Sequence, residues 1–311
     1  MGIINSKIVI EKHLIMYSNL LLSGKLWLCL VKLDILTEER LGELLMEPQY
    51  LDWLLEEKTI VTSEGKQIII YELDIQDDEN VLQLWAKHLR EHYCADSEID
   101  ILRSGLGLTR EQYLRDIKFP DAHIVPGPSV RSGDFTEILI ADYVQYVLDY
   151  TVPRTRYDRK VNRNSSTMGS DLIGYKCGTK ISSSDELIIF EVKACASNKR
   201  SSKVRLQKAV DDSNKDKLRL AETLNAVVQR LIDRNNLSEA QKVQRFQNAT
   251  DRPYSKIYAA AAVHSNASYF EFALKTVSTL HHIDPDLKLV VVHCDKLMDL
   301  IHEIYGRACK C

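Results

Sequence analysis

Apolar and polar positions alternate along the chain with two periods, one typical of strands and one typical of helices. Short apolar runs bounded by polar residues predict strands at 25–36, 67–73, 187–194, 256–264 and 287–293. Apolar positions at helical spacing predict helices at 80–92, 134–150, 203–248, 269–280 and 295–305. Because helices flank a central group of strands, the pattern predicts an α/β fold with a mixed sheet covered by helices.

The sequence Pro126-Gly127-Pro128 interrupts this pattern, since two prolines around a glycine continue neither a helix nor a strand. We therefore predict a linker at this point. A chain of 311 residues is long enough for two domains. The predicted parts are an α/β accessory region at 1–125, which carries no recognisable motif, and a second domain at 126–311.

The most apolar stretch, residues 14–31, is interrupted by Ser18, Asn19 and the pair Ser23-Gly24. It predicts two strands around a turn rather than a membrane span, and it lacks the features of a signal peptide. The seven cysteines are odd in number and scattered, without paired CxxC units, which is typical of reduced thiols. We expect a cytoplasmic protein that does not associate with a membrane.

Composition and charge narrow the function. With 45% apolar and 27% charged residues, the composition is that of an ordinary globular protein. The sequence contains no GxxxxGK[ST] motif, so we do not expect this chain to hydrolyse ATP. Residues 1–130 hold 13 Lys and Arg against 22 Asp and Glu, whereas residues 151–210 hold 13 against 5. A basic block in an acidic chain is a candidate surface for a polyanion, although charge alone leaves a Lys-rich solvated surface equally open. The candidate phosphate-binding residues are Arg154, Arg156, Arg159, Lys160, Arg163, Lys199, Arg200, Lys203 and Arg205.

The strand at 187–194 carries the triplet Glu191-Val192-Lys193. Side chains on a strand alternate between faces, so Glu191 and Lys193 share one face and Val192 points to the other. A carboxylate and an amine on an apolar strand need partners to offset desolvation. The triplet alone is weak evidence, because one such triplet is expected by chance in a chain of this composition.

Two further acids are placed to meet this pair. Asp171 follows Gly169-Ser170 and leads into a short strand, and the Gly- and Ser-containing segment 178–185 predicts a hairpin that brings Asp171 beside Glu191. The alternative for Asp171 is a residue that stabilises the turn.

Glu137 lies on the stripe of Ala141, Val144 and Leu148 in the helix at 134–150, and this position predicts a buried carboxylate. Its alternative is a capping box in which Asp134 is the N-cap. On the same helix the spacing puts Asp142 on the solvent face.

Three carboxylates and a lysine at a strand end predict a divalent-metal site. Carboxylate oxygens suit Mg²⁺ or Mn²⁺, which keep positions open for water and a phosphate oxygen. Lys193 is expected to orient the attacking water and to offset charge on the phosphorus.

The order Glu137, Ser170-Asp171, Glu191-Val192-Lys193 resembles the PD-(D/E)xK nuclease superfamily, with serine in place of the usual proline before the aspartate. More narrowly, residues 132–231 are similar to the HamA nuclease subunits of the Hachiman anti-phage defence system. The matching segments are Gly133–Glu137, Gly169–Gly174, Phe190–Lys193 and Arg219–Asn225.

This resemblance implies a restriction-endonuclease-like core and a Mg²⁺-dependent DNase that cuts phosphodiester bonds with a superfamily 2 helicase partner, HamB. It implies Glu137, Asp171, Glu191 and Lys193 as catalytic residues. The implied metal-site residues are Glu137, Asp171, Glu191 and Val192. Two alternatives stay open: a stand-alone restriction-like nuclease, and a catalytically silent subunit that binds DNA or regulates the helicase.

Overall fold

A computed structural model describes residues 47–196 and 202–311. Residues 1–47 and 48–311 are two separate units, and the account below concerns the second. The strands predicted within 14–36 lie outside the described residues, as do Lys199 and Arg200.

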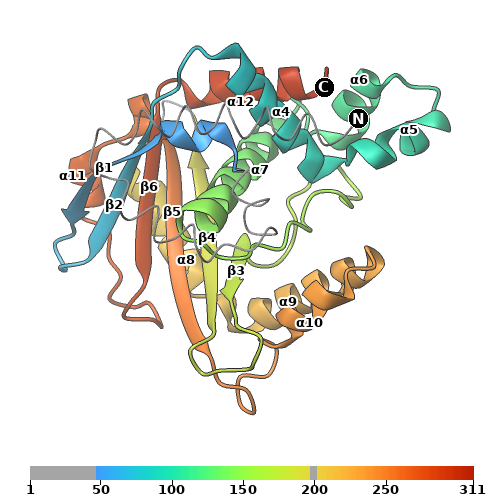
Figure 1. The fold of residues 1–311 in the computed structure, drawn as a ribbon. Coiled ribbons are helices and arrows are strands. Elements are labelled where there is room, and N and C mark those ends of the chain that lie inside the picture. The colour runs from blue at the N-terminus through green and yellow to red at the C-terminus, as the bar shows by residue number, and fades with distance from the viewer. Residues whose placement is uncertain (1–46, 197–201) are drawn as a thin grey trace, which may run out of the picture. The chain divides into compact units, whose positions relative to one another are not determined.

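The second unit is built around one mixed sheet of six strands in the order β1-β2-β6-β5-β4-β3 (Figure 1). The strands are β1 (Leu54–Val61), β2 (Gln67–Leu73), β3 (Leu172–Lys176), β4 (Glu186–Cys195), β5 (Ser255–Ser265) and β6 (Lys288–Cys294). The four inner strands run parallel, and the edge strands β1 and β3 are antiparallel to their neighbours. The α/β class and the flanked mixed sheet are therefore confirmed.

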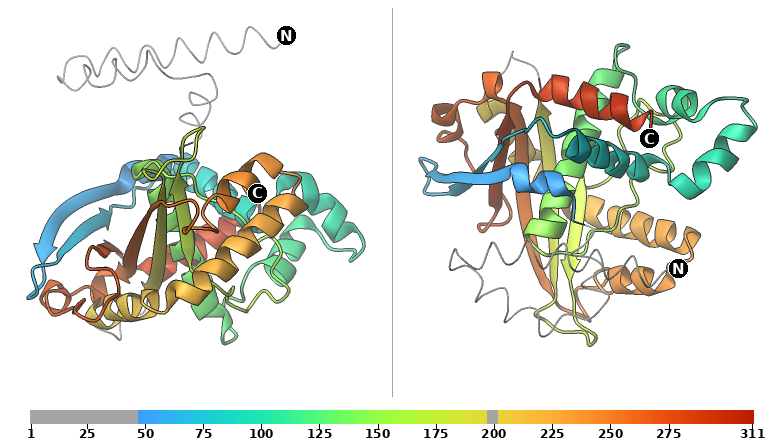
Figure 2. Two further views of the ribbon diagram at one scale, coloured as in Figure 1. Left: turned by 90° about the horizontal axis from the view of Figure 1, so that it is seen from below. Right: turned by 45° about the horizontal axis from the view of Figure 1, so that its top comes forward.

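Helices cover both faces of the sheet (Figure 2). The α-helices are α4 (Glu79–Tyr93), α5 (Asp96–Ser104), α6 (Arg110–Tyr113), α7 (Gly127–Asp142), α8 (Ser202–Ser213), α9 (Asp216–Asp233), α10 (Leu237–Gln244), α11 (Glu271–Leu274) and α12 (Leu297–Ala308). Short 3₁₀ segments are η2 (Gln49–Trp53) and η5 (Asn266–Ser268), and π-helical turns are η3 (Leu114–Lys118) and η4 (Tyr143–Val147). Helices α4, α7 and α12 share one apolar core with the sheet, and α8 to α11 share the other.

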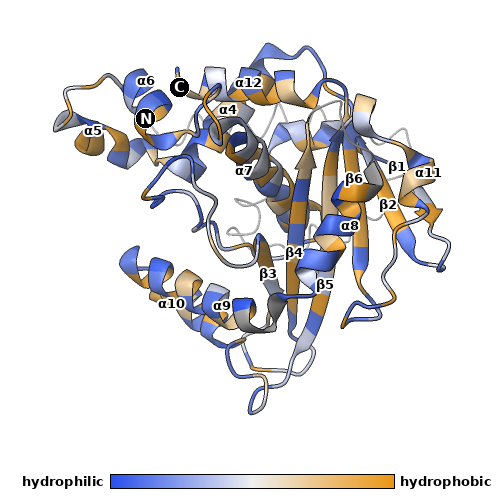
Figure 3. Ribbon diagram, turned by 180° about the vertical axis from the view of Figure 1, so that it is seen from behind, coloured by the Kyte–Doolittle hydropathy of each residue, from blue (hydrophilic) through white to orange (hydrophobic). Residues whose placement is uncertain are grey.

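The inner strands are buried on both faces. In Figure 3 they are predominantly hydrophobic, whereas α8 presents hydrophilic residues outward. On β4, Phe190 packs into the core on the α7 side and Ile189 into the core on the α8 side. On β5, Ala259 to Ala262 are fully buried, and these small side chains leave room for helices on either side of the sheet.

The predicted linker is wrong, because the prolines begin a helix instead of separating two domains. Pro126 is the N-cap of α7 and Pro128 lies in its first turn, where a missing N–H is tolerated. A Cβ at Gly127 would meet the Asp121 carbonyl oxygen at 2.5 Å, so glycine is required there. The sheet also crosses the predicted boundary between 125 and 126, since β2 pairs with β6. The helix predicted at 269–280 is confined to Glu271–Leu274.

Within the described ranges, no helix combines the length and the apolar character that crossing a bilayer demands.

The two cores predict where the fold is sensitive. Phe190 is 1% exposed and Phe272, in α11, is 84% exposed. We expect Phe190→Ala to lower the free energy of unfolding by about 3–5 kcal/mol because it leaves a cavity beside α7, and Phe272→Ala to change it by less than about 0.5 kcal/mol. Denaturant titration of both variants measures the difference, and equal effects would contradict this account of the core.

Candidate functional site

Glu191 and Lys193 lie on one face of β4, the face covered by α8, as strand alternation predicts. Lys193 Nζ donates to Glu191 Oε1 over 2.5 Å. The Glu191 side chain is 4% exposed and that of Lys193 is 21% exposed. Val192, between them, packs into the core on the opposite face. The pair is therefore held inside the protein and not on its surface.

Asp171 reaches this pair through the predicted β3–β4 hairpin. The antiparallel register places Leu172 opposite Phe190, so Asp171 lies beside the second half of β4. Its Oδ2 accepts the Val192 main-chain N–H over 2.9 Å and lies 3.7 Å from Lys193 Nζ.

The turn before Asp171 is fixed from α9. Gly169 has φ of +95°, a conformation that favours glycine. The next residue, Ser170, donates its main-chain N–H to Thr223 Oγ1 over 2.9 Å. The turn and the hairpin together set the direction of the Asp171 carboxylate.

Glu137 points into the protein from α7, as its stripe predicts, and its side chain is 14% exposed. Its Oε2 accepts from Arg156 Nε at 3.1 Å and from the Tyr157 hydroxyl at 2.7 Å. The capping-box alternative is wrong, because α7 begins at Gly127 and Asp134 lies inside it, bonded to Lys160.

Arg156 joins Glu137 to Asp171. Its guanidinium lies 3.1 Å from Glu137 and 3.5 Å from Asp171 Oδ1, while Lys193 contacts the other oxygen of Asp171. The structure thus brings all four predicted catalytic residues into one connected cluster.

Burial and mutual repulsion change the protonation of this cluster. Burial, with the Arg156 cation opposing it and the Asp171 charge adding to it, raises the pKa of Glu137 to about 8. Burial and the Asp171 charge raise the pKa of Glu191 to about 7. Burial lowers the pKa of Lys193, but the neighbouring Asp171 and Glu191 carboxylates outweigh it and the net pKa is raised.

Asp212 is a further acid at the site that the sequence analysis missed. It lies in α8, with Oδ2 3.4 Å from Lys193 Nζ, and its side chain is 11% exposed. Against the effect of burial, hydrogen bonds from Lys208 and Lys215 lower its pKa to about 2. No motif includes it, and at about 100° per residue it lies about 120° from Leu206 and about 160° from Val210, two buried residues of α8, so helical register relative to them gave no signal for it either.

Several of the predicted phosphate-binding cations are held by acids of the protein. Arg159 pairs with Glu98 and Arg163 with Asp121. Lys160 is 4% exposed and lies 2.5 Å from Asp134, so its ammonium neutralises a buried carboxylate instead of facing solvent.

Arg154 pairs with Asp142 over 2.6 Å. The prediction that Asp142 faces solvent is wrong, because its side chain is fully buried by contacts from α4 and η2. The Nε of Arg205 is buried without a hydrogen-bond partner. Lys199 and Arg200 fall outside the described residues, as does the side chain of Lys203.

The donor set fits a hard divalent cation in its chemistry. Glu191 Oε2 is buried without a hydrogen-bond partner, and Arg219 Nη1 lies 4.0 Å from it. A cavity of about 30 Å³, large enough for a water molecule, is lined by residues that include Glu137, Arg156 and Asp171. The three acids do not converge on one point as they stand, since Arg156 and Lys193 lie between them. In the described part of the chain, the group of possible ligands whose atoms all lie within 4.8 Å of one another is His88, His92 and Asp142.

Fold and site define a mixed α/β protein in which the carboxylates of Glu137, Asp171 and Glu191 are connected by Arg156 and Lys193 where β3 begins beside β4. A family model described as HamA matches residues 48–308, and the chain belongs to the HamA family. It is accordingly a Hachiman anti-phage defence protein. Searches of curated proteins and of solved structures gave no match.

The raised pKa values of Glu137 and Glu191 predict a pH dependence of stability. The pKa of each carboxyl group is higher in the folded state than in the unfolded state, where it is about 4.5. Such a group contributes its full stabilisation below about pH 4.5, and this contribution is lost as the pH rises through the pKa of the folded state. Without metal, we expect the free energy of unfolding to fall between pH 5 and pH 8. Glu137→Gln, which cannot ionise, should reduce this fall.

Denaturant titration in a chelator at pH 5 and pH 8 measures the effect. Glu222→Gln, which replaces an exposed acid on α9, is the matched control and should follow wild type. A Glu137→Gln variant that loses as much stability as wild type over this range would overturn the burial argument.

Proposed function

We propose that this HamA-family protein is a metal-dependent DNase that hydrolyses phosphodiester bonds, with its active site at the junction of α7, β3 and β4. The observation that carries the proposal is the single cluster of Glu137, Asp171, Glu191 and Lys193, formed from segments 56 residues apart in sequence. A helix with an inward acid, followed by an antiparallel hairpin and a parallel strand, is also the arrangement expected of a PD-(D/E)xK core.

Mg²⁺ or Mn²⁺ would be held by the carboxylates of Asp171 and Glu191 and the main-chain carbonyl of Val192, with Glu137 facing the same region. Bound there, the ion supplies Lewis-acid stabilisation of a phosphoryl oxygen and a more acidic water. Glu191 Oε2 supports this assignment, because Arg219 lies 4.0 Å away and no group donates a hydrogen bond to this buried oxygen, which costs free energy that a bound cation would recover.

The remaining residues of the cluster orient groups and balance charge. Lys193 is a cation between Asp171, Glu191 and Asp212, placed to direct a nucleophilic water and to offset charge that builds on the phosphorus. Arg156 holds Glu137 and Asp171 together and is itself a candidate contact for a phosphate oxygen.

We further propose DNA as the substrate and a superfamily 2 helicase as the partner, within the cytoplasm. The basic segment 151–210 flanks the acids in sequence, and the chain lacks a phosphate-binding motif for ATP, so an ATP-driven step would require another subunit. The family resemblance is the reason for naming a helicase.

Loss of one acid or of the lysine should stop cutting. We expect Asp171→Asn and Lys193→Ala to reduce plasmid cleavage in Mg²⁺ by about 100-fold or more, because each removes a group placed at the reacting atoms. The assay uses the purified chain together with its helicase, and gel electrophoresis measures the products. The exposed residues Asp251→Asn and Lys242→Ala are matched controls and should cut like wild type.

The same assay separates the two alternatives. Cleavage at a defined sequence without a partner would favour a stand-alone restriction-like nuclease. Undiminished cleavage by both site variants would refute the assignment of the active site, and DNA binding without cleavage or divalent-metal binding would favour a silent regulatory subunit.

A further inference from the structure

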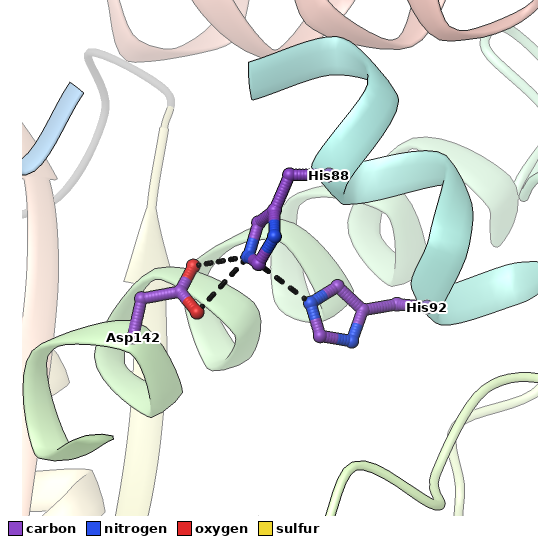
Figure 4. A group of neighbouring side chains, drawn as sticks. All are labelled: His88, His92 and Asp142. Carbon is purple, nitrogen blue, oxygen red and sulfur yellow. Dashed lines mark hydrogen bonds and ion pairs between the residues drawn. The ribbon is translucent and has the colours of Figure 1, made fainter. Parts of the chain in front are cut away.

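We propose that His88, His92 and Asp142 form a second metal site, one that binds a transition metal of the zinc class. The three side chains come from two helices that pack against the same face of the sheet (Figure 4). His88 and His92 are one turn apart on α4, and Asp142 ends α7. Nothing in the proposed nuclease site requires these histidines.

The spacing of the ligand atoms matches one small ion. Ligand atoms that surround a tetrahedral Zn²⁺ at about 2.0–2.1 Å lie about 3.3 Å from one another. His88 Nε2 lies 3.3 Å from His92 Nε2 and 3.0 Å from Asp142 Oδ2. All three ligand atoms are within 4.8 Å of one another.

Protons cannot satisfy the three groups together. His88 Nε2 faces both the Asp142 carboxylate and His92 Nε2 (Figure 4). If His88 Nε2 carries a proton and donates it to the carboxylate, the lone pair of His92 Nε2 is left without that donor. If His88 Nε2 carries no proton, its lone pair faces the lone pairs of the carboxylate. A cation at the centre would satisfy the two imidazole nitrogens and the carboxylate together, which a single hydrogen bond does not.

The surroundings of Asp142 are those of a metal ligand held by outer partners. Its side chain is fully buried, and it accepts hydrogen bonds from the Tyr50 hydroxyl and from Arg154 Nη2. A carboxylate has about four lone-pair sites, so these bonds leave room for an ion. The His88 side chain is 25% exposed, which gives an ion a way in from solvent.

The choice of ion follows from the ligands. Imidazole nitrogen favours Zn²⁺, Co²⁺, Ni²⁺ and Cu²⁺ over Mg²⁺, which prefers oxygen. A bound ion would link α4 to α7, because the two histidines lie on α4 and Asp142 lies on α7. His92 also lines the cavity that Glu137 and Asp171 line.

The test is metal binding by the full chain after chelator treatment, with Co²⁺ alone as the probe. We expect one Co²⁺ per chain with the visible absorption of a tetrahedral site, displaced by Zn²⁺ and retained in millimolar Mg²⁺. His88→Ala and His92→Gln should weaken binding by more than the roughly tenfold to hundredfold that loss of an outer partner costs. Zn²⁺ should also raise the midpoint of thermal unfolding of wild type and leave that of His92→Gln unchanged.

Two controls separate this site from the proposed nuclease site. His302→Ala replaces a half-buried histidine that stacks on His123, away from the cluster, and should bind Co²⁺ like wild type. Asp171→Asn should also keep the Co²⁺ signal even where it abolishes cleavage. Wild-type chain that binds neither Co²⁺ nor Zn²⁺ stoichiometrically would overturn the proposal without recourse to any variant, as would unchanged binding by both histidine variants.

Discussion

The site depends on the hydrogen bond from the Val192 amide to Asp171. It ties the start of β3 to β4 between Glu191 and Lys193, whose side chains lie on the face of the sheet that α8 covers. With Oδ2 fixed in this way, Oδ1 of Asp171 faces Arg156 and, through it, Glu137. An acid on a helix and an acid on a strand are thereby brought together by one main-chain contact. The hairpin register and the turn at Gly169 serve to hold that contact in place.

Charge is nearly balanced inside the cluster, and this balance explains why so many acids are tolerated in the interior. Buried carboxylates are costly unless cations or hydrogen bonds accompany them. Here Arg156 and Lys193 lie between the acids, and the pKa values of Glu137 and Glu191 rise where this compensation is incomplete. A bound divalent cation and the two basic side chains would therefore compete for the same oxygens, so loading the site requires Lys193 or Arg156 to yield part of its contact.

The sequence was sufficient for strands β2 to β6, the hairpin and the inward direction of Glu137, because each follows from a local period or turn, but it did not predict β1. It failed where long-range packing decides. Pro126 and Pro128 lie at the start of a helix, but from composition alone a helix start and a linker look the same. The pairing of β2 with β6 joins the two parts that the sequence analysis predicted to be separate domains. Asp142 has the helical phase of a solvent-facing residue and is buried only because other segments cover it. The i,i+4 spacing of two histidines on α4 was the available signal for the second cluster.

The alanines of β5 have a consequence for how this protein can vary. Ala259 and Ala261 face the core on the α7 side, while Ala260 and Ala262 face the core on the α8 side. These small side chains set the distance between the sheet and the helices on each face. They therefore also set how close Glu137 on α7 and Asp212 on α8 lie to β4. A larger side chain on β5 would move the helices away from the sheet while leaving every polar group of the site in the chain. Loss of function in natural variants can thus arise from a strand that holds no reactive group.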